Sequence, residues 1–349
     1  MSTEHRRRFF PQRLTLAREL RGLTKTELAA RINKTAGAIS HFEGGRSQPD
    51  PATVGALTLA LGVPREFFHT PLSSSRLGLD DCNFRSLRSA SQRERRQLLA
   101  FGTLLSEAEA VLSEHVQLPK VNLETRPLSE SETMEERATE LRREWGLGDG
   151  PVHEVSRLLE RNGIVVALIP NTCERVDAFS CWQGEQPFTF IVETKPPSRQ
   201  RFDAMHEVGH LLLHVDAIPG DKGLELEANS FAAAFLMPRA GLLPHVRGMR
   251  PTLEAFYELK RHWGVSAAAL IRRAFDLRVI GESAYRRLYK RLTMTGARKQ
   301  EPYEIAQSPP TLLSQAAAQS PGVTTVLCER LGVRGLELEA LLQATLPSA

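Results

Sequence analysis

The sequence predicts a predominantly helical α+β protein with one small β-sheet, and three observations lead to this fold class. Residues 9–70 divide into short amphipathic helical segments separated by turn residues, as expected for a small all-helical domain. Three β-like runs follow only much later, at Ile164–Leu168, Ala178–Trp182 and Phe188–Glu193. Helical patterns dominate the rest of the chain, so the sheet is expected to be a minor layer in a mostly helical structure.

A chain of 349 residues is long enough for two or three domains, and we divide it into four segments. Residues 1–70 form the small helical domain. Residues 71–132 contain a loop rich in Ser and Arg, a helix over Gln92–Val116 with an apolar stripe, and a linker with two prolines. Residues 133–245 carry the predicted sheet and the chemical motifs. Residues 246–349 are helical without recognisable chemistry, so we expect them to cover the core or to sense a signal.

Composition excludes several functional classes. The apolar share of 41% and the charged share of 25% are those of an ordinary globular protein. No apolar run approaches the roughly 20 residues that span a bilayer, and the basic N-terminus lacks the apolar stretch of a secretory signal. The four cysteines form no C-x-x-C pair, so neither a disulfide framework nor a cysteine zinc site is indicated. We therefore expect a cytoplasmic protein without a membrane partner.

Residues 9–70 carry clear helix boundaries. Thr24 and Glu27 match a capping box, in which each side chain accepts a hydrogen bond from the other residue's backbone N–H. Asn33 and Lys34 form a tight turn, and Thr35 begins the next short helix. Further boundaries are marked by Gly22, by Asp50 with Pro51, and by Gly62. Two short helices joined by a tight turn predict a helix-turn-helix, whose second helix lies in the major groove of DNA.

The charge of this segment fits a DNA-binding role. Residues 1–70 contain eleven Lys and Arg against six Asp and Glu, a net charge of +5, whereas the whole chain carries +4. Basic side chains that neutralise phosphates release bound counterions, which favours binding. The candidate DNA-binding residues are Lys25, Lys34, Thr35, Ser40, His41 and Arg46. The alternative is a helical interaction domain that binds no DNA, since charge alone also fits a solvated surface.

Residues 9–70 resemble the Xre/Cro family of repressors. The resemblance rests on LTKTELAARINKTAGAISHFEGGRSQPDPATVGALTLALGVPREFF, with its F-E-x-G turn and its P-x-x-x-x-x-L-x-x-A-L-G-V helix. It implies a lambda-repressor-like fold that binds double-stranded DNA, commonly as a homodimer spanning two half-sites. One departure is that the recognition helix has no Arg, Asn or Gln to read bases with paired hydrogen bonds. We therefore expect low base specificity, or readout by Ser40, His41 and flanking residues.

The main chemical motif is H-E-x-x-H, formed by His206, Glu207 and His210 in a predicted helix that begins near Arg199. The two histidines are one turn apart, so both imidazoles project from one face and can bind the same metal ion. Glu207 sits beside His206 and can act as a general base toward a metal-bound water, whose pKa zinc lowers. The motif alone is suggestive rather than decisive, because it is short.

A third ligand is needed, because catalytic zinc usually has three protein ligands and one open position. The downstream helical stretch contains Glu225 and Asn229, which are one turn apart. Glu225 is the candidate ligand, and Asn229 can support a ligand histidine. Glu227 is the competing candidate, but it points to a different helix face. His214 follows His210 by one turn, and a supporting or surface role is favoured for it over a place on the metal.

The text RFDAMHEVGHLLLH, followed by E-x-EANSFAAAFLMP, resembles the ImmA/IrrE family of metallopeptidases. VDAFS at 176–180 fits the strand upstream of the motif, and the resemblance spans roughly residues 133–245 with a helical tail at 259–274. It implies a zincin-like fold with one Zn²⁺ ion and cleavage of a repressor protein to induce genes. The residues carried over are His206, His210 and Glu225 as metal ligands and Glu207 as catalytic base.

Two functions remain open at this point. The first is a DNA-binding transcriptional regulator whose zinc metallopeptidase domain cleaves a repressor, itself or a toxin-system partner. The second is a non-enzymatic transcription factor whose peptidase-like domain senses a ligand or a partner. Glu207 favours the first, because a non-enzymatic zinc domain does not need it. The run Phe188–Val192 also has two interpretations, an edge strand that receives substrate by β-augmentation or a plain core strand.

Overall fold

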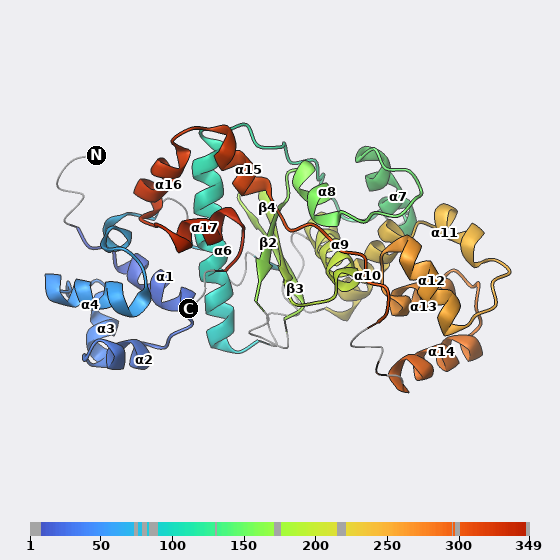
Figure 1. The fold of residues 1–349 in the computed structure, drawn as a ribbon, viewed down its shortest axis with the longest axis horizontal. Helices are drawn as coiled ribbons and strands as arrows, with labels where there is room; N and C mark the ends of the chain where they lie inside the picture. The colour runs from blue at the N-terminus through green and yellow to red at the C-terminus, as the bar shows by residue number, and fades with distance from the viewer. Residues whose placement is uncertain are drawn as a thin grey trace.

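The computed structural model places a small sheet between two groups of helices (Figure 1). It describes residues 8–72, 76–78, 82–83, 90–129, 131–170, 176–214, 221–294, 296 and 301–346. The N-terminal and C-terminal helices lie on one side of the sheet with the long helix α6 (Gln92–Ser113), and most of the other helices lie on the opposite side. The predominantly helical α+β fold class is thereby confirmed. No helix in these ranges is both long and apolar enough to cross a bilayer.

The N-terminal unit follows the helix boundaries expected from its sequence. It consists of α1 (Pro11–Leu20), α2 (Lys25–Arg31), α3 (Ala36–Glu43), α4 (Pro51–Leu61) and the 3-10 helix η2 (Arg65–His69). Thr24 and Glu27 form the capping box of α2, and the Thr35 side chain caps α3. Asn33 has a φ of 52° in the turn between these helices, and Gly62 ends α4 in the left-handed conformation. Capping side chains therefore mark where α2 and α3 begin, and a left-handed glycine marks where α4 ends.

A buried ion pair joins this unit to α6. Arg13 Nη1 lies 2.8 Å from Glu107 Oε2, and Arg13 Nη2 lies 3.1 Å from Oε1, with both side chains 0% exposed. The guanidinium also donates to the backbone carbonyls of Thr70, at 3.0 Å, and Pro71, at 2.8 Å. Buried charges require such partners, because an unpaired charge in an apolar interior is costly. The N-terminal unit is thus attached to α6 by a specific polar contact as well as by apolar packing.

The sheet has the strand order β1-β3-β4-β2. Its strands are β1 (Cys82–Asn83), β2 (Val165–Ile169), β3 (Ala178–Gln183) and β4 (Gln186–Val192). β3 pairs antiparallel with both β4 and β1, and β2 runs parallel to β4. The sequence predicts the last three strands to within two residues, whereas β1 lies in a segment expected to be loop. The edge-strand interpretation of Phe188–Val192 is wrong, because β4 lies between β3 and β2.

The two faces of the sheet belong to different hydrophobic cores. Val165 and Ala167 of β2 pack in one core with α6 and the N-terminal unit, where Phe101 of α6 meets Phe190 edge to face. Val166 packs in the other core, with the helices that follow α6. Those helices are α7 (Met134–Glu144), α8 (Val155–Arg161), α9 (Pro197–Leu213), α10 (Lys222–Leu236), α11 (Arg239–Val246), α12 (Leu253–Trp263), α13 (Ala267–Asp276) and α14 (Glu282–Met294).

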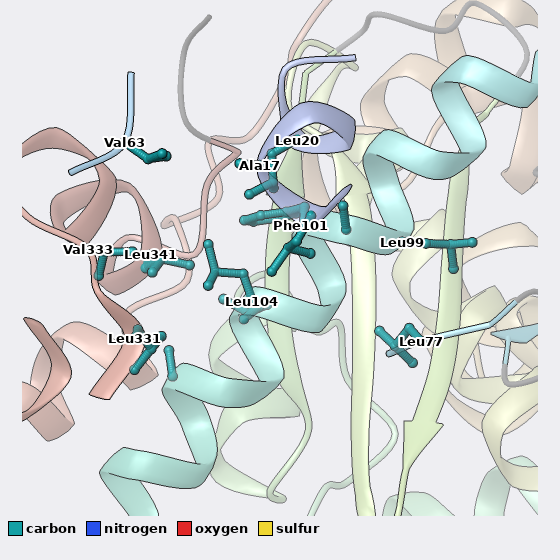
Figure 2. Packing of buried hydrophobic residues seen from close by; sticks show 14 of the residues in the cluster. Ala17, Leu20, Val63, Leu77, Leu99, Phe101, Leu104, Leu331, Val333 and Leu341 are labelled. Atoms are coloured by element: carbon teal, nitrogen blue, oxygen red, sulfur yellow. The ribbon is translucent and has the colours of Figure 1, made fainter. Parts of the chain in front are cut away.

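The C-terminal helices return to the N-terminal side of the molecule (Figure 1), where they contribute to the apolar cluster shown in Figure 2. They are α15 (Leu312–Gln319), α16 (Val323–Leu331) and α17 (Leu336–Leu342). Leu331, Val333 and Leu341 lie in the same apolar cluster as Leu104 of α6 and Ala17 of α1. The helical region after residue 245 therefore contributes to both cores, because α12–α14 pack with α9 and α10 instead.

Candidate metal centre and DNA-binding face

Two helices bring the metal-site motif together. α9 packs against the sheet through buried apolar residues such as Met205 and Val208, and its histidine face meets α10. Gly209 allows this close approach, because a Cβ at this position would lie 3.2 Å from the backbone Cα of Ala228 and 3.2 Å from the ring of Phe231. The packing of α10 on α9 therefore sets the distance from which a carboxylate can reach the histidines.

The three candidate ligands converge at distances that fit a zinc ion. His206 Nε2 and His210 Nε2 lie 3.1 Å apart, and the Glu225 carboxylate oxygens lie 3.5 Å from the first and 3.7 Å from the second. Zinc bonds of about 2.0–2.2 Å in a tetrahedron place neighbouring ligand atoms roughly 3.3–3.6 Å apart, close to these separations. The three side chains are between 9% and 16% exposed, and no other such group of potential ligands is found in the described ranges.

Glu207 lies beside this centre but is anchored to the sheet. Ser180 Oγ of β3 donates a 2.8 Å hydrogen bond to Glu207 Oε2, which fixes the orientation of the carboxylate. Burial raises the pKa of Glu207 to about 7, against the lowering effects of His206 and of the Ser180 hydrogen bond. Sequence reasoning identified Glu207 but missed Ser180, although Ser180 ends the VDAFS segment. A buried, oriented carboxylate with a pKa near neutrality is suited to exchanging a proton.

The electrostatics of the two histidines differ. Burial, with the nearby His206, lowers the pKa of His210 to about 3, so His210 is neutral as a metal ligand must be. Burial also opposes protonation of His206, but the carboxylates of Glu225 and Glu207 outweigh it and raise the pKa of His206. The same carboxylates that favour a positive charge on His206 also favour a cation beside it.

The other two candidate residues on α10, Asn229 and Glu227, have different partners. Asn229 is exposed, and its Nδ2 donates to the backbone carbonyl of Glu225 at 2.6 Å rather than to a histidine. Glu227 Oε2 lies 3.0 Å from His214 Nε2. His214 Nδ1 in turn lies 3.0 Å from His210 Nδ1. Sequence reasoning did not connect Glu227 with His214, because that contact depends on how α9 and α10 pack.

A charged group lies one turn before His206. Lys195 Nζ lies 2.5 Å from Asp203 Oδ2 and 2.6 Å from Asp177 Oδ1. Burial raises the pKa of Asp203, against the lowering effect of Lys195. This group links the end of β4, the start of β3 and α9. It therefore connects the sheet to the helix that carries the histidines.

The candidate DNA-binding residues surround α3 at the surface. Lys34, Thr35, Ser40, His41 and Arg46 are all exposed. Lys25 is partly engaged within the protein, because its Nζ hydrogen-bonds to Ser40 Oγ at 2.9 Å and lies 3.4 Å from Glu43 Oε2. Lys34 and Arg46 are therefore the stronger candidates for phosphate contacts. Apart from His41, the exposed positions of α3 carry short side chains, as the sequence indicates.

The fold and the site define a protein that combines a helix-turn-helix domain with a metallopeptidase-like domain. Residues 14–68, from α1 into η2, match the family model for a helix-turn-helix. Residues 159–275, from the end of α8 into α13, match the family model for the IrrE N-terminal-like domain and include all three candidate ligands. The chain is thus a fusion of an Xre-type helix-turn-helix domain with a domain of the IrrE/ImmA type. No curated protein sequence shows a significant match to it.

Proposed function

We propose that this chain is a DNA-binding transcriptional regulator whose zinc metallopeptidase domain cleaves a repressor or another partner protein. The convergence of His206, His210 and Glu225 beside the buried carboxylate of Glu207 carries this proposal. A site that only bound a structural metal would use four protein ligands and would need no adjacent free carboxylate. Three ligands and one oriented base are the requirements of hydrolysis.

Each residue has a defined task in this reaction. His206, His210 and Glu225 hold the metal, and zinc bound there supplies a Lewis acid that polarises a carbonyl and acidifies water. Glu207 takes a proton from the attacking water on its carboxylate and returns it to the departing amine. Ser180 keeps this carboxylate in one orientation through its hydrogen bond. Burial of this carboxylate raises its pKa to about 7, so that it can both accept and return a proton near neutral pH.

The DNA-binding half positions this activity at a gene. We propose that α3 enters the major groove of double-stranded DNA, with Lys34 and Arg46 on the phosphates. The short side chains of α3 support a modest contribution of direct base readout. DNA binding and cleavage of a partner protein would then control expression of the same gene.

The test separates metal binding from proton transfer. His206→Ala should abolish stoichiometric zinc, whereas Glu207→Gln should keep zinc at about one per chain and lose cleavage of candidate repressor proteins. Glu258→Gln on α12 is the matched control, because Glu258 is exposed and pairs only with Arg261 among the described residues. Elemental analysis, a cleavage assay and a reporter gene are the measurements.

Equal zinc content in His206→Ala and wild type would overturn the site. Undiminished cleavage by Glu207→Gln would overturn the role of Glu207. If Glu207→Gln regulates its target genes like wild type, proteolysis is not the mechanism. The non-enzymatic sensor then becomes the better account of the chain.

A further inference from the structure

Three side chains form a continuous path from the surface to one of the candidate ligands. His214 ends α9 and is 4% exposed, whereas Glu227 on α10 is 45% exposed. Glu227 Oε2 lies 3.0 Å from His214 Nε2, and His214 Nδ1 lies 3.0 Å from His210 Nδ1. His210 Nε2, at the far side of the same ring, faces His206 Nε2 at 3.1 Å.

With both histidines neutral, one arrangement of protons satisfies all of these contacts. An ionised carboxylate can only accept, so His214 Nε2 must be the donor to Glu227. A neutral imidazole has one donor and one acceptor nitrogen, so His214 Nδ1 is then an acceptor. The partner of that acceptor, His210 Nδ1, must carry a proton. His210 Nε2 therefore presents its lone pair toward His206 and Glu225.

We propose that His214 and Glu227 are positioning residues, which hold His210 in the Nδ1–H tautomer that a metal ligand at Nε2 requires. Ligand histidines commonly donate their second N–H to a carboxylate or a carbonyl oxygen, which orients the ring and fixes the tautomer. Here the imidazole of His214 takes that place. By accepting the N–H of His214, the Glu227 carboxylate makes His214 Nδ1 the acceptor for His210. The inference rests on the proposed function for its metal, whereas the proton on His210 can be observed without one.

This assignment also separates the roles of two acids on α10. Glu225 brings its carboxylate to both candidate ligand rings. Glu227 contacts His214 instead. The second acid that the sequence offered as a metal ligand therefore acts on His214, which in turn contacts His210. The spacing H-E-x-x-H-x-x-x-H thus contains a pair of candidate ligands followed by the residue that orients the second of them.

Two substitutions of His214 distinguish an acceptor from a space-filling group. In His214→Asn, the amide Oδ1 is bonded to Cγ as Nδ1 is in histidine, so an acceptor remains beside His210. In His214→Leu, a side chain of similar size fills the site without any acceptor. Glu227→Ala is to be made in the wild type and in the His214→Asn background. The Asn oxygen needs no partner to remain an acceptor. Glu227→Ala should therefore have no effect in the His214→Asn background.

Zinc affinity of the full chain is measured by competition with a chelator. His214→Leu should weaken zinc binding by about 10–100-fold, and His214→Asn should stay close to wild type. Glu227→Ala should weaken binding in the wild type and have no further effect in His214→Asn. Circular dichroism and thermal melting check that each variant is folded.

A second readout needs neither metal nor activity. In metal-free protein labelled with ¹⁵N-histidine, the ring of His210 should carry its proton on Nδ1 in wild type and in His214→Asn. In folded His214→Leu that proton should move to Nε2. The inference is overturned if His214→Leu retains the Nδ1–H form, or if His214→Asn loses zinc as severely as His214→Leu. Absence of zinc from wild type would instead overturn the proposed function, and the ¹⁵N measurement would still decide the tautomer.

Discussion

The ion pair between Arg13 and Glu107 offers a quantitative test of how the DNA-binding unit is attached. We consider Glu107→Gln, which keeps the volume and one acceptor but removes the negative charge. Arg13 then remains fully buried beside a neutral amide and two carbonyl oxygens, those of Thr70 and Pro71. Removing one partner of a buried ion pair costs about 3–5 kcal/mol. Because Gln still accepts a hydrogen bond, we expect a loss near about 3 kcal/mol in the free energy of unfolding.

Substitution of the other partner should lower the free energy of unfolding by more. Arg13→Met removes the guanidinium that pairs with Glu107 and also removes the donor to the backbone carbonyls of Thr70 and Pro71. Each unsatisfied carbonyl adds about 1–3 kcal/mol, so the total loss should exceed that of Glu107→Gln. A contact that acted only through charge would give equal losses for the two variants. The order of the two effects therefore tests the hydrogen bonds as well as the ion pair.

Urea unfolding at pH 7 is the assay, followed by far-ultraviolet circular dichroism and by fluorescence. All three tryptophans lie after residue 70, so fluorescence does not report on the N-terminal unit. Glu114→Gln is the matched control, because Glu114 follows α6 and pairs with Arg330 at the surface. This control should leave the free energy of unfolding nearly unchanged. The reasoning fails if Glu107→Gln is no more destabilising than Glu114→Gln, or if Arg13→Met is the milder of the two core variants.

Other contacts lead to predictions of their own. Gly209→Val should push α10 away from α9 and lower zinc, by elemental analysis, well below one per chain, with DNA affinity kept within about twofold; full occupancy would contradict the close-packing argument. Burial raises the pKa of Glu109 to about 7 from 4.5, so its stabilising effect is complete below pH 4.5 and is lost as pH rises through 7. The stability of Glu109→Gln relative to wild type should therefore rise by roughly 2.5 kcal/mol between pH 5 and pH 8 in urea unfolding, and a constant difference would refute this. Lys34→Ala and Arg46→Ala should each reduce the slope of log affinity against log salt by about 0.9, measured by fluorescence anisotropy, and an unchanged slope would exclude that phosphate contact.

Features that depend on neighbouring residues could be predicted from the sequence. The capping box of Thr24 and Glu27 forms within one helical turn, so residue identity and spacing suffice to predict it. His206 and His210 share a helix face for the same reason, since a spacing of four residues is one turn. The approach of Glu225 to both rings agrees with the choice of Glu225 over Glu227 as candidate ligand.

Features that depend on packing between distant segments could not be predicted. Glu107 has the sequence pattern of a surface charge, and only its position opposite Arg13 reveals that it is buried. β1 has two residues, too few to show any periodicity, and it exists because β3 offers an edge to pair with. The contact of His214 with Glu227 spans two helices, so its geometry is set by their packing.

The division of the sheet between two cores has a consequence for genetics. Side chains of successive residues in a strand point to opposite faces, so neighbouring codons of β2 serve different halves of the protein. Substitutions at Val165 and Ala167 press on α6 and the DNA-binding unit, whereas a substitution at Val166 presses on the helices of the metal centre. In a saturation scan scored separately for operator occupancy and for zinc retention, the two phenotypes should alternate residue by residue along this strand. Adjacent codons of this strand would then affect DNA binding and metal binding in turn.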